Sequence, residues 1–160
     1  MKQFSMIFLR TAIICMGLGV LALCTLLLPL LWQDVDREFP SYSYAVYAVF
    51  TAMFIAAIPF FVGLFNAWKL LTYINRGMPF TRESAKTLRT IAFSAGSISA
   101  IYIVSMPFFY VWSDRDDAPG LMLIGIVLVG APIVIAMFAS LLHQLVREAT
   151  ELKSENELTV

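Results

Sequence analysis

The chain has 160 residues, of which 60% are hydrophobic and 14% are charged. A single small soluble domain cannot bury so much apolar surface, so this composition excludes an ordinary soluble protein. The formal net charge of zero at pH 7 says nothing about partners by itself.

Four uncharged apolar stretches determine the expected fold. Each reaches the roughly 20 residues that a helix needs to cross about 30 Å of hydrocarbon. Bilayers also demand that backbone groups be hydrogen-bonded internally, which leaves helices as the spanning element. We therefore predict an all-α fold, a four-helix transmembrane bundle of two helical hairpins in one domain over residues 1–160. The predicted spans are residues 11–33, 43–71, 90–113 and 119–144, and residues 145–160 form a cytoplasmic tail helix.

The start of the first span has two alternative interpretations that we reject. Lys2 and Arg10 precede an apolar run as in a signal peptide, but the run is too long and no small-residue cleavage site follows. Leu23 is too bulky for the position before a lipidated cysteine at Cys24. Cys15 and Cys24 are more than two helical turns apart, too distant to form a disulfide, and we interpret them as small hydrophobic residues.

The two predicted hairpins are similar around their outer loops. In both, a tryptophan near the end of the ascending span precedes two aspartates and then a proline. A duplicated hairpin would explain this and would give a parallel repeat about an axis along the membrane normal. The alternative is that interfacial tryptophans, acidic loops and membrane prolines recur independently. The matching segments are Trp32-Gln33-Asp34-Val35-Asp36 and Trp112-Ser113-Asp114-Arg115-Asp116.

The basic residues predict the orientation. Nine of the 11 lysines and arginines lie at the N-terminus, around the middle loop and on the tail, whereas the outer loops hold two, with six acids. The positive-inside rule therefore places both termini and the middle loop in the cytoplasm. Trp32, Trp68 and Trp112 lie near span ends, where we expect them to act as lipid-interface anchors.

The predicted spans contain few side chains suited to catalysis, ion transport or metal binding. No acidic or basic side chain lies deep in any of them, although pumps and proton-coupled carriers usually need one. His143, the only histidine, lies near the inner end of the fourth span and is interpreted as an interfacial polar residue. The outer aspartates could hold a divalent cation weakly, but a solvated loop is the favoured interpretation. Without a phosphate loop, HExxH motif or nucleophile elbow, we expect no enzyme and no catalytic, cofactor-binding or metal-binding residues.

The prolines and the small residues of the predicted spans bear on how the helices pack. Every predicted span contains a proline, which we interpret as a kink rather than as the broken helix of a transporter site. The third span has a run of small residues, from Ser94 to Ala100, that lets another helix approach closely. Glycines of the first and fourth spans are the expected surfaces that it meets: Gly17, Gly19, Gly125 and Gly130.

The middle loop predicts a turn and a helix start. Gly77 and Pro79 make the turn, and Thr81 is a good N-cap for the helix that follows. Three basic residues, Arg82, Lys86 and Arg89, then fall on one helical face. This face can meet anionic lipid headgroups, or it can dock a protein.

The tail continues the helical pattern of the fourth span. Arg147 and Glu151 are spaced to form an ion pair. We predict that the tail helix folds back beneath the bundle, with its acidic side toward the basic residues of the middle loop. The expected acidic side is Glu151, Glu155 and Glu157, and the expected apolar side is Leu145, Leu152 and Leu158.

These two elements carry a family resemblance. The pattern Lys69-Leu-Leu71 … Ile74-Asn-Arg-Gly77-Met-Pro-Phe80-Thr81 … Leu88-Arg-Thr-Ile91, with the closing Ala149-x-x-Leu152-Lys153-x-Glu155-Asn156-Glu157-Leu158-Thr159-Val160, resembles the YoaS-like family of small bacterial four-span proteins of unknown function. The resemblance implies a bacterial inner-membrane protein, often encoded beside a small helix-turn-helix regulator. It implies no catalytic residues.

The expected function is non-enzymatic and regulatory or sensory: binding of a cytoplasmic protein, such as a helix-turn-helix regulator, without direct contact to nucleic acid. The alternative is a transport or immunity protein that handles an apolar molecule or peptide in the kinked bundle. The lipid bilayer is an expected partner, and a homo-oligomer is left open. The predicted docking residues are Arg82, Lys86, Arg89, Leu152, Glu155 and Leu158.

Overall fold

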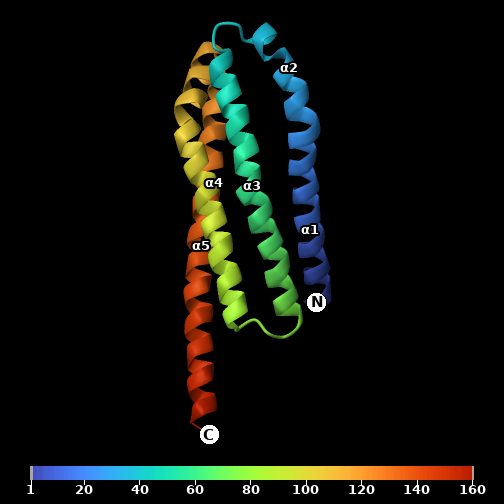
Figure 1. The fold of residues 1–160 in the computed structure, drawn as a ribbon, viewed down its shortest axis with the longest axis vertical. Helices are drawn as coiled ribbons and strands as arrows, with labels where there is room; N and C mark the ends of the chain where they lie inside the picture. The colour runs from blue at the N-terminus through green and yellow to red at the C-terminus, as the bar shows by residue number, and fades with distance from the viewer. Residues whose placement is uncertain (1, 160) are drawn as a thin grey trace.

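The computed structural model describes residues 2–159 and forms one elongated bundle (Figure 1). Its helices run antiparallel, and no strand occurs in this part of the chain. Four helical stretches are long and apolar enough to cross a membrane. The all-α, four-span fold predicted from the sequence is therefore confirmed. The elements are α1 (Lys2–Ala22), a π-helical turn (Leu23–Leu27), α2 (Leu28–Glu38), α3 (Ser43–Asn75), α4 (Arg82–Arg115) and α5 (Pro119–Leu158).

The two ends of the bundle differ in charge. The short connections over residues 39–42 and 116–118 lie at one end, next to the aspartates, and we name it the acidic end. The loop over residues 76–81 and both termini lie at the other, which we name the basic end (Figure 1). The start of α4 is capped as predicted, because Thr81 Oγ1 accepts a hydrogen bond from Ser84 N at 3.2 Å. Gly77, with φ +72°, supplies the turn.

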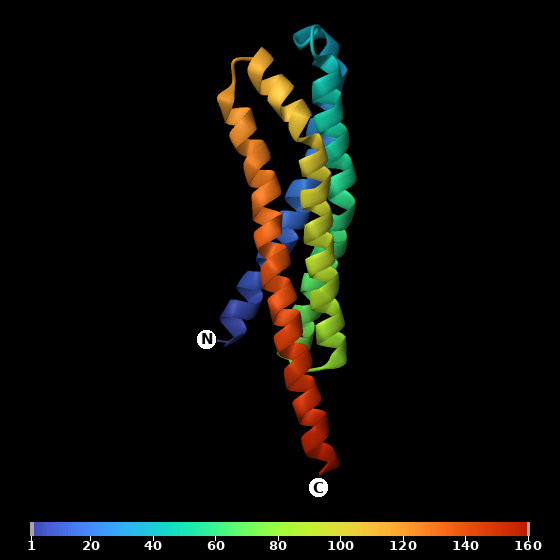
Figure 2. The ribbon, with the colours of Figure 1, turned by 90° about the vertical axis from the view of Figure 1, so that its left-hand side faces the viewer.

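The helices do not pack equally. Helix α4 packs closely against both α3 and α5, which do not contact each other, whereas α1 contacts α3 alone among the other spanning helices within residues 2–159. Seen from the side, α1 crosses behind the others at an oblique angle, and its N-terminal half leans away from α3 (Figure 2). The buried core gathers toward the acidic end, where Val49 and Phe109 lie in one cluster and Leu28 and Val46 in another.

Small residues of α4 do allow a close approach, but their partner differs from the expected one. Ser94 lies against Gly63 of α3, where a Cβ added to the glycine would be 3.4 Å from Ser94 Cβ. Ser99 Oγ donates a hydrogen bond to the Val129 carbonyl of α5 at 2.9 Å. None of the four glycines expected to meet this run does so: Gly125 meets Met106 and Phe109 of α4, Gly17 meets Leu64 of α3, and no non-local atom lies within 4 Å of a Cβ at Gly19 or Gly130.

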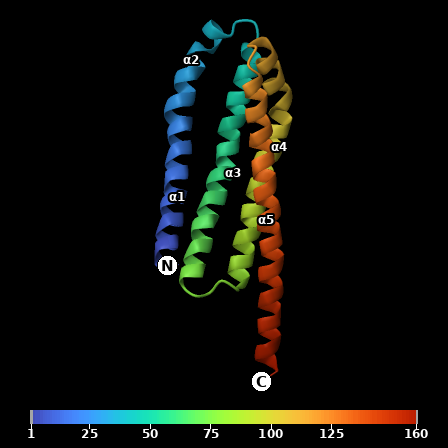
Figure 3. The ribbon, with the colours of Figure 1, turned by 180° about the vertical axis from the view of Figure 1, so that it is seen from behind.

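The prediction that the tail folds back is wrong. Helix α5 is uninterrupted from Pro119 to Leu158, and its C-terminal part projects beyond the bundle (Figure 3). No glycine or proline follows Pro132 within α5, so nothing interrupts the backbone hydrogen bonds. Leu152 and Leu158 are six residues apart on this helix, about 240° around its axis. They therefore point to different sides, whereas Leu145 and Leu152, seven residues apart, share one side, so Leu158 does not belong to the expected apolar face.

Candidate functional site

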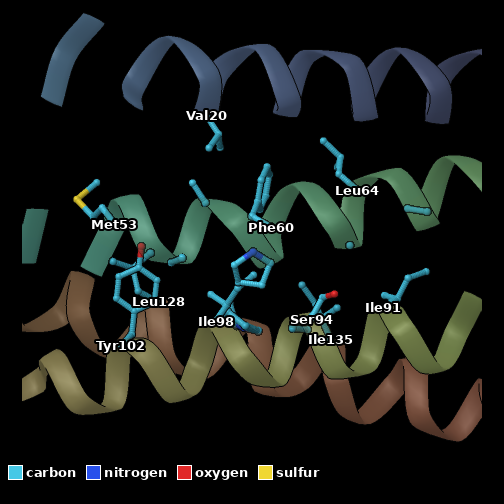
Figure 4. Close-up of a pocket in the computed structure, with 18 of the residues that line it drawn as sticks. Val20, Met53, Phe60, Leu64, Ile91, Ser94, Ile98, Tyr102, Leu128 and Ile135 are labelled. Atoms are coloured by element: carbon cyan, nitrogen blue, oxygen red, sulfur yellow. The ribbon is translucent and has the colours of Figure 1, made fainter. Parts of the chain in front are cut away.

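The bundle contains an apolar cavity between all four helical stretches (Figure 4). Its volume of about 520 Å³ falls within the roughly 300–1,000 Å³ of small-molecule sites. The side chains that line it in residues 2–159 include no Asp, Glu, Lys, Arg or His. The wall includes Val20, Leu23 and Cys24 from the first helical stretch, Met53, Phe60 and Leu64 from α3, Ile91 and Ile98 from α4, and Leu128 and Ile135 from α5.

Two hydroxyl groups interrupt this apolar wall. Ser94 and Tyr102, both on α4, are only 4% and 7% exposed. Neither side chain has a hydrogen-bond partner among the residues that the structure describes. Figure 4 shows the Tyr102 hydroxyl on the cavity side of α4, directed toward α3. Buried hydroxyls usually have a partner, so these two are available to a bound molecule.

The cavity has an open side. Within residues 2–159, α1 makes no contact with α5, although both helices contribute to the lining. The α5 residues at this opening remain accessible: Val127 is 57% exposed and Ile135 is 53% exposed. An entrance between α1 and α5 would face the hydrocarbon of the membrane, because both helices are of spanning type.

Irregular backbone borders the cavity. The π-helical turn supplies two of its residues, Leu23 and Cys24, and such turns are frequent at functional sites. Pro59 of α3 and Pro132 of α5 also line it. Each proline lacks the N–H that would bond the carbonyl four residues before it. The prolines interpreted from sequence as kinks thus lie in the wall of a cavity.

A second hollow of about 580 Å³ lies at the basic end, between the start of α4 and the last turns of α5. We name it the charged groove. His143 holds its two walls together, because Nδ1 donates a hydrogen bond to the Ala85 carbonyl at 2.7 Å. From sequence, His143 was interpreted only as an interfacial residue. The charged side chains lining the groove are Arg82, Lys86 and Arg89 of α4 and Arg147, Glu151 and Glu155 of α5.

Four of the six predicted docking residues lie in the charged groove, and two lie outside it. Arg82, Lys86, Arg89 and Glu155 line the charged groove. Leu152 and Leu158 lie outside it on the projecting part of α5, and they are 63% and 85% exposed. The docking role of all six stays a prediction.

The ion pairs near the groove stay within single helices. Lys86 pairs with Glu83 at 3.6 Å, and Arg147 pairs with Glu151 at 3.0 Å as its spacing predicted. No ion pair joins α4 to α5 in the described part of the chain. The attraction expected between the basic residues of α4 and the acidic residues of the tail therefore operates only at longer range.

The three tryptophans contact neighbouring helices. Trp112 Nε1 is buried and has no hydrogen-bond partner among the described residues. Their role as lipid-interface anchors stays a prediction. The contacts, between ring centroids or from a cation to a ring centroid, are Trp32 with Tyr47 at 4.8 Å, Trp112 with Phe39 at 5.7 Å, and Arg10 with Trp68 at 5.3 Å.

At the acidic end, a hydrogen bond joins the two outer connections. Tyr42 donates a hydrogen bond to Asp116 Oδ1 at 3.0 Å. The pKa of Tyr42 is raised above its ordinary value, first by burial and then by the bond to the Asp116 carboxylate. Within residues 2–159, no group of three His, Cys, Asp or Glu side chains is placed to hold a metal ion.

These features define an integral membrane protein with a four-span helical bundle. The chain belongs to the family described as "Protein of unknown function (DUF2975)", whose pattern matches residues 30–160. It is 42% identical over 160 residues to the "Uncharacterized membrane protein YoaS" of Bacillus subtilis (strain 168), with 100% of both chains covered. The resemblance found in the middle loop and tail is therefore confirmed. No solved structure matches the chain.

Proposed function

We propose that this chain is a non-enzymatic regulatory or sensory protein of the bacterial cytoplasmic membrane. In this proposal the basic end faces the cytoplasm, where it holds or releases a soluble protein. The orientation is supported by the distribution of charge: nine of the 11 lysines and arginines lie on the basic side of the spans. The positive-inside rule assigns such an end to the cytoplasm.

The observation that carries the proposal is the projecting part of α5. His143 is bonded to the first turns of α4, so the residues beyond Arg147 have passed the end of that helix. Residues 148–158 extend the helix by roughly 16 Å. This segment keeps Leu152 and Leu158 exposed. An exposed helix with apolar residues, beside a groove of charged side chains, suits recognition of a protein surface.

The partner class that we propose is a small helix-turn-helix regulator. This class follows from the family resemblance, whereas the docking surface follows from the geometry. The surface combines a short apolar anchor on α5 with charged residues at the rim, which is the usual composition of a protein interface. In such a complex the regulator binds the nucleic acid, and this chain contacts only the protein.

Affinity capture from detergent extracts tests the proposal. Leu152→Ser and Leu158→Ser are compared separately, because the two side chains point to different sides of α5. Lys153→Ser is the matched control, since it places the same residue at an adjacent exposed position. We expect one leucine variant to lose most of the captured regulator, while the control keeps it. Full capture by both leucine variants, or no regulator captured by the unaltered chain, would refute the proposal.

The apolar cavity favours a second candidate function. A transport or immunity protein that handles an apolar molecule needs a space between its helices, and this bundle has one of about 520 Å³ with an opening between α1 and α5. The neighbouring genes discriminate between the candidates. A gene for a helix-turn-helix protein favours regulation, and a gene for an ATP-binding subunit favours transport.

A further inference from the structure

We propose that the cavity binds an uncharged membrane lipid with one long apolar chain and a hydroxyl or carbonyl group. The inference deepens the second candidate function by naming the class of ligand. It does not depend on the cytoplasmic partner, because the cavity and the charged groove share no lining residue.

The position of the cavity determines which molecules can reach it. Tyr102 lies 13 residues before Arg115 at one end of α4, and Ser94 lies 12 residues after Arg82 at the other. At 1.5 Å per residue these separations are roughly 20 Å and 18 Å. A hydrocarbon layer of about 30 Å centred on this helix includes both hydroxyls. Molecules dissolved among the lipid chains therefore meet the opening directly.

Ser94 points to a ligand because it departs from the rest of its helix. Every other serine and threonine of α4 has a hydrogen bond; Thr90 and Ser97, for example, donate to the carbonyl four residues before them. Ser94 has no such bond, although it is 4% exposed and borders the cavity. An unpaired hydroxyl in a low-dielectric surrounding costs free energy, and a polar group of a bound molecule would remove that cost.

Tyr102 provides a second unpaired hydroxyl beside the cavity. Its hydroxyl also has no hydrogen-bond partner among the described residues, and the side chain is 7% exposed. The two hydroxyls lie eight residues apart on α4, about 12 Å along the axis, so one water molecule cannot serve both. A buried water typically needs two to four polar partners, and within residues 2–159 no lining side chain other than Ser94 and Tyr102 carries an N–H or O–H group. An elongated organic molecule is the better occupant.

The charge of the ligand follows from the lining. No Asp, Glu, Lys, Arg or His borders the cavity within residues 2–159. A phosphate, carboxylate or ammonium group would lose its hydration there without gaining a counter-ion, which is costly in hydrocarbon. Phospholipid headgroups are therefore excluded, whereas a neutral alcohol or carbonyl can bond to either hydroxyl.

Photolabelling of the purified full chain in phospholipid vesicles tests the site. The probe is a long-chain alcohol that carries a diazirine in its chain. We expect crosslinks to cavity residues such as Val20, Phe60 and Ile98, and we expect unlabelled alcohol to compete for them. The alkyl phosphate of the same chain length should not compete. Equal competition by the alkyl phosphate, or labelling confined to lipid-facing side chains, would overturn the proposal.

Variants separate the cavity from general lipid contact. Tyr102→Phe and Ser94→Ala keep the shape but remove a hydrogen bond, and each should weaken competition by roughly 3- to 10-fold. Tyr110→Phe is the control, because Tyr110 is 59% exposed on the same helix. Unchanged competition in both cavity variants would overturn the role of the hydroxyls.

Filling the cavity provides the second test. Ala57→Phe should abolish competed labelling, while Ile58→Phe, at a position 68% exposed, should not; circular dichroism shows whether both variants fold. Persistent competed labelling in a folded Ala57→Phe variant would overturn the proposal. Binding without transfer of the alcohol between leaflets would refute transport and leave the site intact.

Discussion

His143 of α5 donates a hydrogen bond from Nδ1 to the Ala85 carbonyl of α4 at 2.7 Å, and so fastens the fourth span to the first turns of the third. The bond lies where α5 leaves the bundle. The His143 side chain, partly buried between the two helices, therefore helps to hold α5 on α4 just before the projecting segment begins.

Replacing His143 should loosen this junction. We expect His143→Ala to lower the free energy of unfolding by about 0.5–1.5 kcal/mol, the usual contribution of one hydrogen bond. His143→Asn should recover part of the loss, since the amide nitrogen of asparagine occupies a position similar to that of Nδ1. Unfolding by sodium dodecyl sulfate in mixed micelles measures both variants. Gln144→Ala, at the exposed neighbouring position, is the control and should behave like the unaltered protein.

The close approach of Gly63 to Ser94 gives a second prediction. A Cβ at Gly63 would lie 3.4 Å from Ser94 Cβ, so the branched side chain of Gly63→Val must push α3 and α4 apart. We expect a loss of about 1–3 kcal/mol in the same unfolding assay, as is usual for overpacking. Gly130→Val adds the same side chain where nothing lies within 4 Å. Equal stability of the two variants would contradict close packing of α3 on α4.

The fold was predictable because the sequence features that determine it lie within short segments of the chain. Span lengths, the cap at Thr81 and the turn at Gly77 depend on short stretches of sequence and on the thickness of a bilayer. The family could be recognised because the middle loop and the tail have a specific pattern. The path of the tail is also predictable from sequence, because no helix-breaking residue follows Pro132 and this outweighs the possible charge pairing with α4.

The cavity could not be predicted, because it depends on how α1 is placed. In the sequence, Ser94 belongs to a run of small residues that predicts helix packing, and Tyr102 lies within an apolar stretch. A tyrosine in the middle of a predicted span is a signal that could have been used, since its hydroxyl needs a partner there. Within residues 2–159, α1 contacts α3 but neither α4 nor α5, and this arrangement, like the π-helical turn, is a property of the assembled bundle that no periodicity in the sequence reveals.

The contact between Tyr42 and Asp116 predicts a pH dependence. The pKa of Tyr42 is raised in the folded protein, so folding retains a proton that the unfolded chain loses near pH 10. The stabilising contribution is therefore fully present below the ordinary tyrosine pKa and disappears as the pH rises through the raised value. The difference in unfolding midpoint between the unaltered protein and Tyr42→Phe should be constant from pH 7 to about 9 and shrink at higher pH. A difference that grows with pH would contradict this sign.

The acidic loops should contribute little to stability. Asn in place of Asp34, Asp36, Asp114 and Asp116 together should leave membrane insertion and abundance nearly unchanged, since solvated charges contribute little individually. The amide of Asn at position 116 can still accept the bond from Tyr42. Quantitative blotting of membrane fractions measures the abundance. A lost cellular phenotype at normal abundance would instead indicate a ligand or cation site in these loops.

The orientation of the bundle is the prediction on which the docking proposal depends. In a background in which the two native cysteines are replaced by alanine, single cysteines are introduced by Asp36→Cys and Asp116→Cys at the acidic end and by Met78→Cys and Asn156→Cys at the basic end. An impermeant maleimide applied to whole spheroplasts should label only the first pair. After the cells are opened, all four positions should react, because each belongs to an exposed residue. The reverse pattern would place the projecting part of α5 outside the cell, and no cytoplasmic regulator could then reach it.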